Sequence, residues 1–352
     1  MTRRTAWTAF QVGCTYIGTV VGAGFASGQE VYQFFGRFGD WGYVGIPIAI
    51  LIFSWIGYRI MRLGRSLNAR SYHEVNSYLF GPAVGRVMDL VLMLMLLGVT
   101  VAMIAGAGEL FRERLGVSFW LGAGLTLVVT YMTLFRGMNG VLRANSVIVP
   151  IMVSFVMFAF IRSLALQGTH APFAASRFLN HGHPVLAGIS ALIYSALNVS
   201  LAAGVLIPLG ADISDSRALR LGALGGAVGL GAMLLAVTIT LFAHYPQALA
   251  YQVPMGYIAS RLGTLWQWMF VFVLWGEIFS TLVGNVYAVG AQFAGGSPKK
   301  MPTVTAVILL VALAVSQIGF ANIVHYGYTV FGWASLTMLA ALLWPRAALP
   351  DA

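Results

Sequence analysis

The chain has 352 residues, of which 59% are hydrophobic and only 9% are charged, and its mean hydropathy is +0.84. Soluble globular domains carry about 25% charged residues, so the composition excludes a soluble domain and indicates an all-α polytopic membrane protein. The formal net charge of +10 does not indicate nucleic-acid binding, because the basic residues lie in short loops between apolar segments. We expect the lipid bilayer as a partner and no nucleic acid, and leave protein partners open.

Ten apolar segments have lengths near the ~20 residues that a helix needs to cross a bilayer. The predicted spans are 6–35 (interrupted), 42–62, 86–110, 117–135, 141–165, 185–211 (interrupted), 221–243, 264–292, 302–321 and 326–345. Two connecting segments are also predicted to be helical. Residues 63–82 are expected at the cytoplasmic surface and residues 246–262 at the external surface.

The loop charges predict the orientation in the membrane. If the amino terminus is cytoplasmic, the inner loops hold 14 of the 20 Lys and Arg residues and the outer loops hold the other six. Cytoplasmic loops are enriched in basic residues. We therefore predict a multi-pass membrane protein with both termini in the cytoplasm.

The first span contains a glycine-rich stretch, Gly18–Glu30, with glycines at 18, 22, 24 and 28. In lipid every backbone group must be paired, so unwound backbone is tolerated only inside protein or beside a water-filled cavity. The same spacing also permits close helix packing. We predict an interruption here that forms half of a binding site, with packing as the alternative.

The sixth span holds a comparable stretch, Tyr194–Gly204, and is also predicted to be broken. These two spans open two groups of five, and because five is odd the second group must be inverted relative to the first. We predict a single membrane transporter domain over 1–352, with one repeat at about 6–165 and the other at about 185–345.

The segment Gly22-Ala23-Gly24-Phe25-Ala26-Ser27-Gly28-Gln29-Glu30 resembles the first-span signature of YkvI-type bacterial membrane proteins. Those proteins belong to the amino acid–polyamine–organocation superfamily, and the resemblance implies a small-molecule substrate and a location in the bacterial cytoplasmic (inner) membrane. The resemblance covers essentially the whole chain in length, span count and the placing of both interrupted segments. It implies the LeuT fold, a five-plus-five inverted repeat with helices 1 and 6 broken, and it implies no particular substrate.

In such a fold the broken helices hold the substrate near the membrane midplane, and free N–H groups at the start of a half-helix suit a carboxylate. The candidate substrate-binding residues are Tyr16, Thr19, Gly22, Ala23, Gly24, Phe25 and Ser27 on the first span, and Asn198 and Ser200 on the sixth. Asn285 is a further candidate. Each polar side chain alone fits a helix–helix hydrogen bond equally well.

Resemblance to sodium-coupled members implies an ion site. Its ligands would be the hydroxyls of Ser280 and Thr281 and the carbonyls of Gly18, Val21 and Glu277. Oxygen ligands suit a small hard cation. The alternative is that these hydroxyls bond their own helix, as is common in membranes. Apart from sodium as the coupling ion, no cofactor or other metal is expected.

Proton coupling is the rival interpretation. Some proton-driven relatives place a lysine in the fifth span, but this chain has lysines only at 299 and 300, and its fifth span offers Asn145 and Ser146 instead. Glu30, beside Gln29, is the residue expected to titrate, because an ionisable group in a span is costly and usually functional. The alternative for Glu30 is an outer-leaflet carboxylate paired with Arg37 or a neighbouring residue.

Together these features predict a secondary active transporter of an amino acid or similar zwitterion, coupled to sodium and working by alternating access. An enzyme is not expected, because the glycine spacing does not fit a dinucleotide fingerprint and no catalytic motif occurs. Two alternatives stay open. One is a proton-coupled transporter, and the other is a nutrient sensor that binds ligand without concentrative transport, as resemblance to spore-germinant receptor subunits implies.

Overall fold

The computed structural model describes residues 3–168, 170–178, 183–251, 253–295, 297, 299–316 and 320–343, and this part of the chain is helical without strands. The elements are α1 (Arg3–Val20), α2 (Ala23–Ala26), α3 (Gln29–Phe34), η1 (Gly36–Phe38), α4 (Asp40–Ser66), α5 (Tyr72–Phe80), α6 (Pro82–Leu115), α7 (Phe119–Leu134), α8 (Met138–Gln167), α9 (His170–Phe178), α10 (Pro184–Asp212), α11 (Ser216–Ala243), η2 (Gln247–Ala250), α12 (Pro254–Leu262), α13 (Thr264–Ala294), α14 (Met301–Val315) and α15 (Phe320–Leu343).

Six of these helices are long and apolar enough to cross a membrane, namely α4, α6, α8, α10, α11 and α13. Helices α7 and α14 and the last part of α15 are shorter apolar helices. Helices α1 to α3 occupy the first predicted span. Every predicted span therefore contains helix, while the number of membrane crossings stays a prediction.

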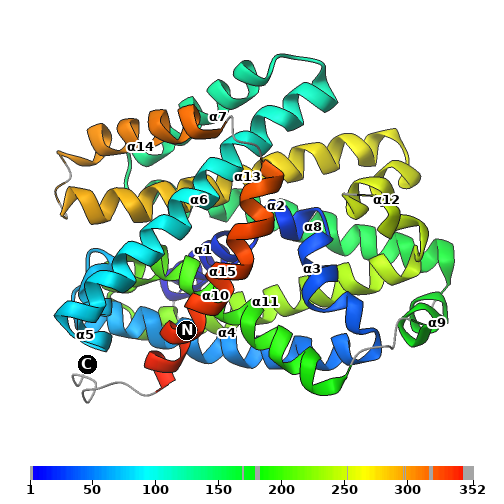
Figure 1. The fold of residues 1–352 in the computed structure, drawn as a ribbon, viewed down its shortest axis with the longest axis horizontal. Coiled ribbons are helices and arrows are strands. Elements are labelled where there is room, and N and C mark those ends of the chain that lie inside the picture. The colour runs from blue at the N-terminus through cyan, green and yellow to red at the C-terminus, as the bar shows by residue number, and fades with distance from the viewer. Residues whose placement is uncertain are drawn as a thin grey trace.

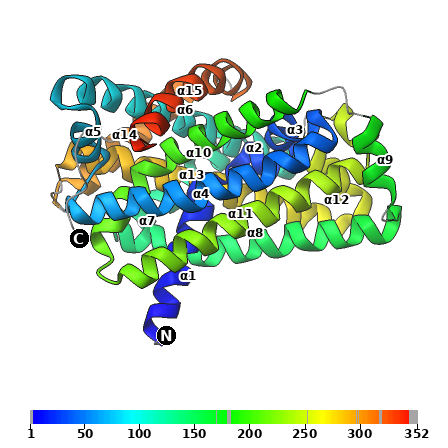
Figure 2. The ribbon, with the colours of Figure 1, turned by 90° about the horizontal axis from the view of Figure 1, so that it is seen from below.

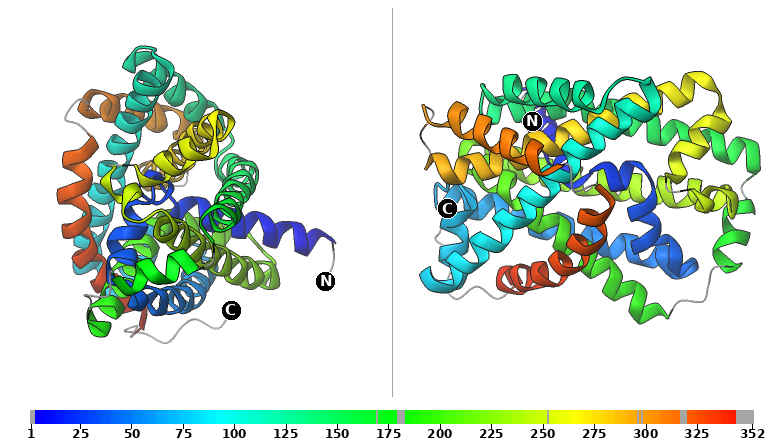
Figure 3. Two further views of the ribbon diagram at one scale, coloured as in Figure 1. Left: turned by 90° about the vertical axis from the view of Figure 1, so that its right-hand side faces the viewer. Right: turned by 45° about the horizontal axis from the view of Figure 1, so that its top comes forward.

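Helices α4, α8, α11 and α13 run lengthwise through the molecule (Figure 1). Helix α5 lies at one end of this bundle, and α9 and α12 lie at the opposite end (Figures 1 and 2). The amino-terminal end of α1 projects beyond its neighbours (Figures 2 and 3). Both connecting segments that were predicted to be helical contain helix: the first holds α5, and the second holds η2 and α12. Helix α9 was not predicted.

The first span is interrupted, as predicted. Helix α1 ends at Val20, and Gly22 is extended, with φ −129° and ψ −174°, before α2 begins. Gly28, with φ 81°, then separates α2 from α3. That left-handed conformation is readily adopted by glycine, which has no Cβ.

The predicted break in the sixth span is wrong, because α10 is a continuous helix. Within it, Ser195 Oγ donates to Ala191 O at 2.8 Å and Asn198 Nδ2 donates to Tyr194 O at 3.0 Å. The small residues serve packing: a Cβ added to Gly204 would lie 2.5 Å from the Cβ of Ala288 on α13. Close approach of two membrane helices favours glycine at the contact, and it does not require the helix to unwind.

Candidate functional site

Two hydroxyls of α13 contact carbonyl groups at the end of α1. Ser280 Oγ donates to Gly18 O at 2.8 Å, and Thr281 Oγ1 donates to Val21 O at 3.1 Å. The last carbonyls of a helix have no intrahelical partner, which is why the interruption makes these oxygens available. The structure thus brings together four of the five predicted ion ligands, and both hydroxyls bond across to α1 rather than to their own helix.

A further oxygen comes from α8. Asn145 Oδ1 lies 2.8 Å from Ser280 Oγ, and Asn145 Nδ2 donates to Val141 O at 2.9 Å. The second bond sets the orientation of the amide, because the reverse orientation would turn Oδ1 toward a carbonyl. A hydroxyl has one hydrogen, so Ser280 cannot donate to Gly18 O and Asn145 Oδ1 at once. The cluster has more oxygen acceptors than hydrogens, which suits a cation.

Glu277, the remaining predicted ligand, lies one turn before Thr281 in α13. Its side chain is 1% exposed, and Oε2 has no hydrogen-bond partner. The carboxyl group interacts electrostatically with that of Glu30. The side chain of Glu277, an ionisable group within a predicted span, is therefore buried, in addition to the main-chain carbonyl that is predicted to bind the ion.

A small cavity lies beside the interruption, between the first span and helices α6, α10 and α13. Its lining residues are Thr19, Val20, Gly22, Glu30, Val99, Met103, Leu197, Asn198, Leu201, Thr281 and Asn285. Its volume is about 20 Å³, enough for about one water molecule. A larger ligand therefore enters only if the lining side chains move apart. Of the predicted substrate residues, Thr19, Gly22, Asn198 and Asn285 line this cavity.

Glu30 contributes the carboxyl group of the cavity. Its side chain is 8% exposed, and Oε1 accepts from Asn198 Nδ2 at 3.5 Å. The carboxyl group packs on the backbone of α2, since a Cβ added to Gly24 would lie 2.7 Å from Glu30 Oε2. The alternative ion pair with Arg37 does not form, because Glu30 turns inward and the Arg37 guanidinium lies over the Phe38 ring.

The other predicted residues do not line this cavity. Tyr16 OH donates to Phe53 O on α4 at 2.8 Å, and Ser27 Oγ donates to Gly24 O at 2.8 Å. Ser200 lines a separate cavity of about 10 Å³ with residues of α5, α6 and α15. Gln29 is exposed rather than directed into the site. Ala23 and Phe25 are buried in the core and do not line the cavity.

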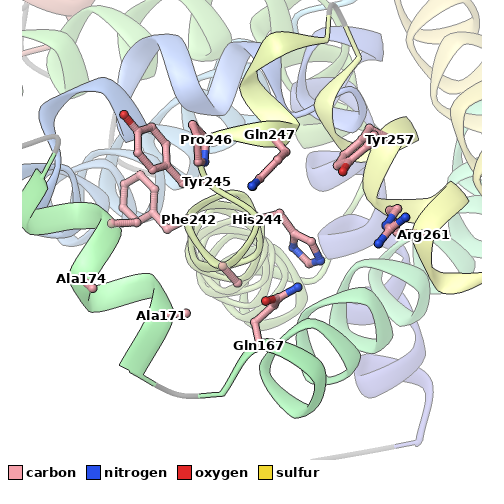
Figure 4. Close-up of a pocket in the computed structure, with 12 residues that line it drawn as sticks. Gln167, Ala171, Ala174, Phe242, His244, Tyr245, Pro246, Gln247, Tyr257 and Arg261 are labelled. Atoms are coloured by element: carbon pink, nitrogen blue, oxygen red, sulfur yellow. The ribbon is translucent and has the colours of Figure 1, made fainter.

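A larger hollow lies elsewhere, where the end of α11 meets α9, η2 and α12 (Figure 4). It has a volume of about 920 Å³ and includes His244, Tyr257 and Arg261 in its lining. Burial, and then the charge of Arg261, lowers the pKa of His244. This hollow contains neither the interruption nor a carboxyl group, so we assign the candidate site to the smaller cavity.

No protein-family model matches the sequence. The membrane protein YkvI of Bacillus subtilis (strain 168) is 34% identical over 340 residues, which are 97% of this chain and 96% of the relative. The protein YyaD of the same organism is 21% identical over 328 residues, which are 93% of this chain and 94% of YyaD. Both similarities therefore cover nearly the whole length of the chain.

Solved transporter structures share the fold at low sequence identity. A Na⁺-coupled sialic acid symporter in a substrate-bound outward-open state matches with a TM-score of 0.70 and 12% identity, over 96% of this chain and 79% of the symporter. MhsT in complex with L-phenylalanine matches with a TM-score of 0.64 and 18% identity, over 90% of this chain and 80% of MhsT. Mhp1, a nucleobase-cation-symport-1 family transporter, matches with a TM-score of 0.59 and 14% identity, over 95% of this chain and 77% of Mhp1. The bundle therefore has the LeuT-like fold of multi-pass membrane transporters.

Proposed function

The chain belongs to the family of the Bacillus subtilis membrane protein YkvI, and from this premise we propose that it is a secondary active transporter of an amino acid or similar zwitterion, coupled to sodium. The observation that carries the proposal is the contact of Ser280 and Thr281 with the carbonyls of Gly18 and Val21. A sodium-coupled symporter is among the proteins that share the fold, which supports the same mechanism here.

The sodium ligands we propose are the oxygens of Gly18, Val21, Ser280 and Thr281, with the Glu277 carbonyl as predicted and with Asn145 Oδ1 added. These groups lie on α1, α8 and α13, so an ion bound among them favours the arrangement that holds the three helices together. Loss of the ion would release α1 from α13. This differential affinity is what couples an ion gradient to alternating access.

We further propose the five-plus-five inverted repeat, at about 6–165 and about 185–345. Each half places a short helical segment between its second and third long helices, α5 in the first half and η2 with α12 in the second. These segments lie at opposite ends of the bundle (Figure 2), as inversion requires. With the α5 end in the cytoplasm, the basic loops face inward and both termini are cytoplasmic.

The test is uptake of radiolabelled amino acids into proteoliposomes under an imposed sodium gradient or pH gradient. We expect sodium-driven uptake that is lost in the double variant Ser280→Ala/Thr281→Ala. Ser154→Ala is the matched control, because Ser154 is exposed and bonds only to its own helix, at Pro150 O. If the double variant keeps full sodium dependence, the proposed ion site is wrong.

A proton-coupled transporter that uses Glu30 is the second candidate, favoured by the burial of Glu30 beside the cavity. Uptake that follows a pH gradient without sodium and collapses in Glu30→Gln would establish it. Ligand binding without uptake under either gradient would instead indicate a nutrient sensor.

A further inference from the structure

The cavity beside the interruption is acidic. Glu30 lines it, and Glu277 lies close enough for the two carboxyl groups to interact electrostatically. Glu277, Thr281 and Asn285 follow one another at intervals of four residues, so they share one face of α13. None of the residues that line the cavity is Lys, Arg or His.

A buried carboxylate without a counter-ion is strongly unfavourable, above all within a membrane. A sodium ion among Ser280, Thr281 and the α1 carbonyls would balance one negative charge. Two ionised carboxyl groups would still leave one carboxylate without a counter-ion, which the ammonium group of a ligand would supply. The charge of the site thus favours a ligand with a positive group.

The carboxyl group of Glu30 also lies beside the stretch that was predicted to bind a substrate carboxylate. It packs directly on Gly24, within the stretch whose N–H groups were expected to bind that carboxylate. A ligand carboxylate placed there would meet Glu30 at short range, and like charges at such a distance repel. The geometry therefore disfavours the predicted orientation of the ligand.

A second, independent observation concerns Asn285. Its side chain is 6% exposed and lines the cavity, and its Nδ2 has no hydrogen-bond partner. A buried donor without an acceptor costs free energy. A ligand oxygen in the cavity would accept a hydrogen bond from this amide.

We propose that this cavity binds an amine-bearing ligand, with Glu30 as the counter-ion of its ammonium group and Asn285 Nδ2 as the donor to a ligand oxygen. Asn198, which bonds to Glu30 and to Tyr194 O, positions the carboxylate. The inference rests on the proposed transport function. It assigns the contacts of the ligand's ammonium group, extends the substrate class from amino acids to amino alcohols, and excludes simple carboxylate anions. The lining residue Met103 is flexible and can move aside for such a ligand.

The test is thermal unfolding of the purified full chain in detergent with sodium chloride and matched probe sets. The probes are alanine, ethylamine and propionate; leucine, 3-methylbutylamine and 4-methylpentanoate; and phenylalanine, 2-phenylethylamine and 3-phenylpropanoate. We expect at least one amine-bearing probe to raise Tm by about 2–4 °C at saturation. The amino acid should raise Tm more than the matching plain amine, because only the amino acid has an oxygen that accepts from Asn285. The carboxylate-only probes should give no shift.

Glu30→Gln should abolish the shift and Asn285→Leu should reduce the advantage of the amino acid over its amine. Glu109→Gln is the control, because Glu109 is half-exposed and paired with Arg112 at 2.6 Å. Should a variant unfold, Glu30→Asp, which keeps the charge, should retain a weaker shift. A shift from the carboxylate-only probes, a full shift in Glu30→Gln, or no shift from any amine-bearing probe overturns the inference. Amine-dependent shifts without gradient-driven uptake would leave the inference standing and overturn the transport function instead.

Discussion

At the scale of single residues, Gly18 is the tightest point of the candidate ion site. A Cβ added there would lie 1.8 Å from Asn145 Oδ1 and 2.7 Å from Ser280 Oγ. Side chains from two other helices therefore approach the backbone of α1 more closely than any residue larger than glycine allows. The same contact brings the Gly18 carbonyl within reach of Ser280.

Gly18→Ala should therefore separate α1 from α8 and α13. We expect a loss of about 1–3 kcal/mol in the free energy of unfolding, as in other overpacked cores, and loss of the sodium-dependent rise in Tm. Gly225→Ala on α11 is the control, since no atom lies within 4 Å of the added Cβ. Equal sodium responses in the two variants would contradict the proposed site.

Two substitutions of Asn145 should change the sodium affinity in opposite directions. Asn145→Asp adds a negative charge to the oxygen cluster and should tighten sodium binding about tenfold, or ~1.4 kcal/mol. Asn145→Leu removes the oxygen and should weaken binding. Sodium titrations followed by Tm give both affinities, and a change in the same direction in both variants would contradict the role of Asn145 as a ligand.

Among the helices, the two stretches rich in small residues, Gly18–Glu30 and Tyr194–Gly204, have different backbone conformations. In the first span the glycines accompany an interruption, whereas in α10 the small residues permit contact with α13 in an unbroken helix. The local sequence does not separate these outcomes, because unwinding and close packing favour the same residue types. The neighbouring helix decides between them.

Gly204→Ala tests the packing role of α10. The added methyl group would meet Ala288 at 2.5 Å, so we expect destabilisation of about 1–3 kcal/mol despite the better helix propensity of alanine. Gly188 lies on the same helix, and a Cβ added there would have nothing within 4 Å. Gly188→Ala should therefore leave the stability unchanged or raise it slightly. Thermal unfolding of the two variants measures the difference. Equal stability would show that α10 and α13 do not pack this closely.

At the scale of the whole molecule, polar contacts join the ends of three helices near the α10–α11 connection. Thr5 Oγ1 donates to Asp215 Oδ2 at 2.8 Å, and Arg65 on α4 donates to Ser216. The hydrogen bond from Thr5, with those from the backbone of α11, lowers the pKa of Asp215. Because the folded-state pKa is lowered, this contact stabilises the fold above the ordinary pKa of aspartate and is lost as pH falls through the lowered value.

Thr5→Val should loosen this end of α1. Cys14 is the single cysteine of the chain and is buried in α1, so its alkylation by N-ethylmaleimide reports how often α1 moves away from the bundle. We expect the labelling rate to rise several-fold in Thr5→Val and to stay unchanged in Thr303→Val, which alters an exposed residue of α14. Equal rates in the two variants would show that the Thr5–Asp215 contact does not restrain α1.

The sequence by itself determined the membrane class, the approximate helix positions and the interruption after Val20. These depend on local hydrophobicity and on the rule that backbone groups in lipid must be paired. It also singled out Gly18, Val21, Ser280 and Thr281, through a family resemblance. Only the tertiary structure decided that Asn145 joins Ser280, that Glu30 turns inward onto Gly24, and that α10 stays continuous. Each of these depends on which faces of separate helices meet, and side-chain packing between helices sets that alignment, whereas the pattern along one helix does not.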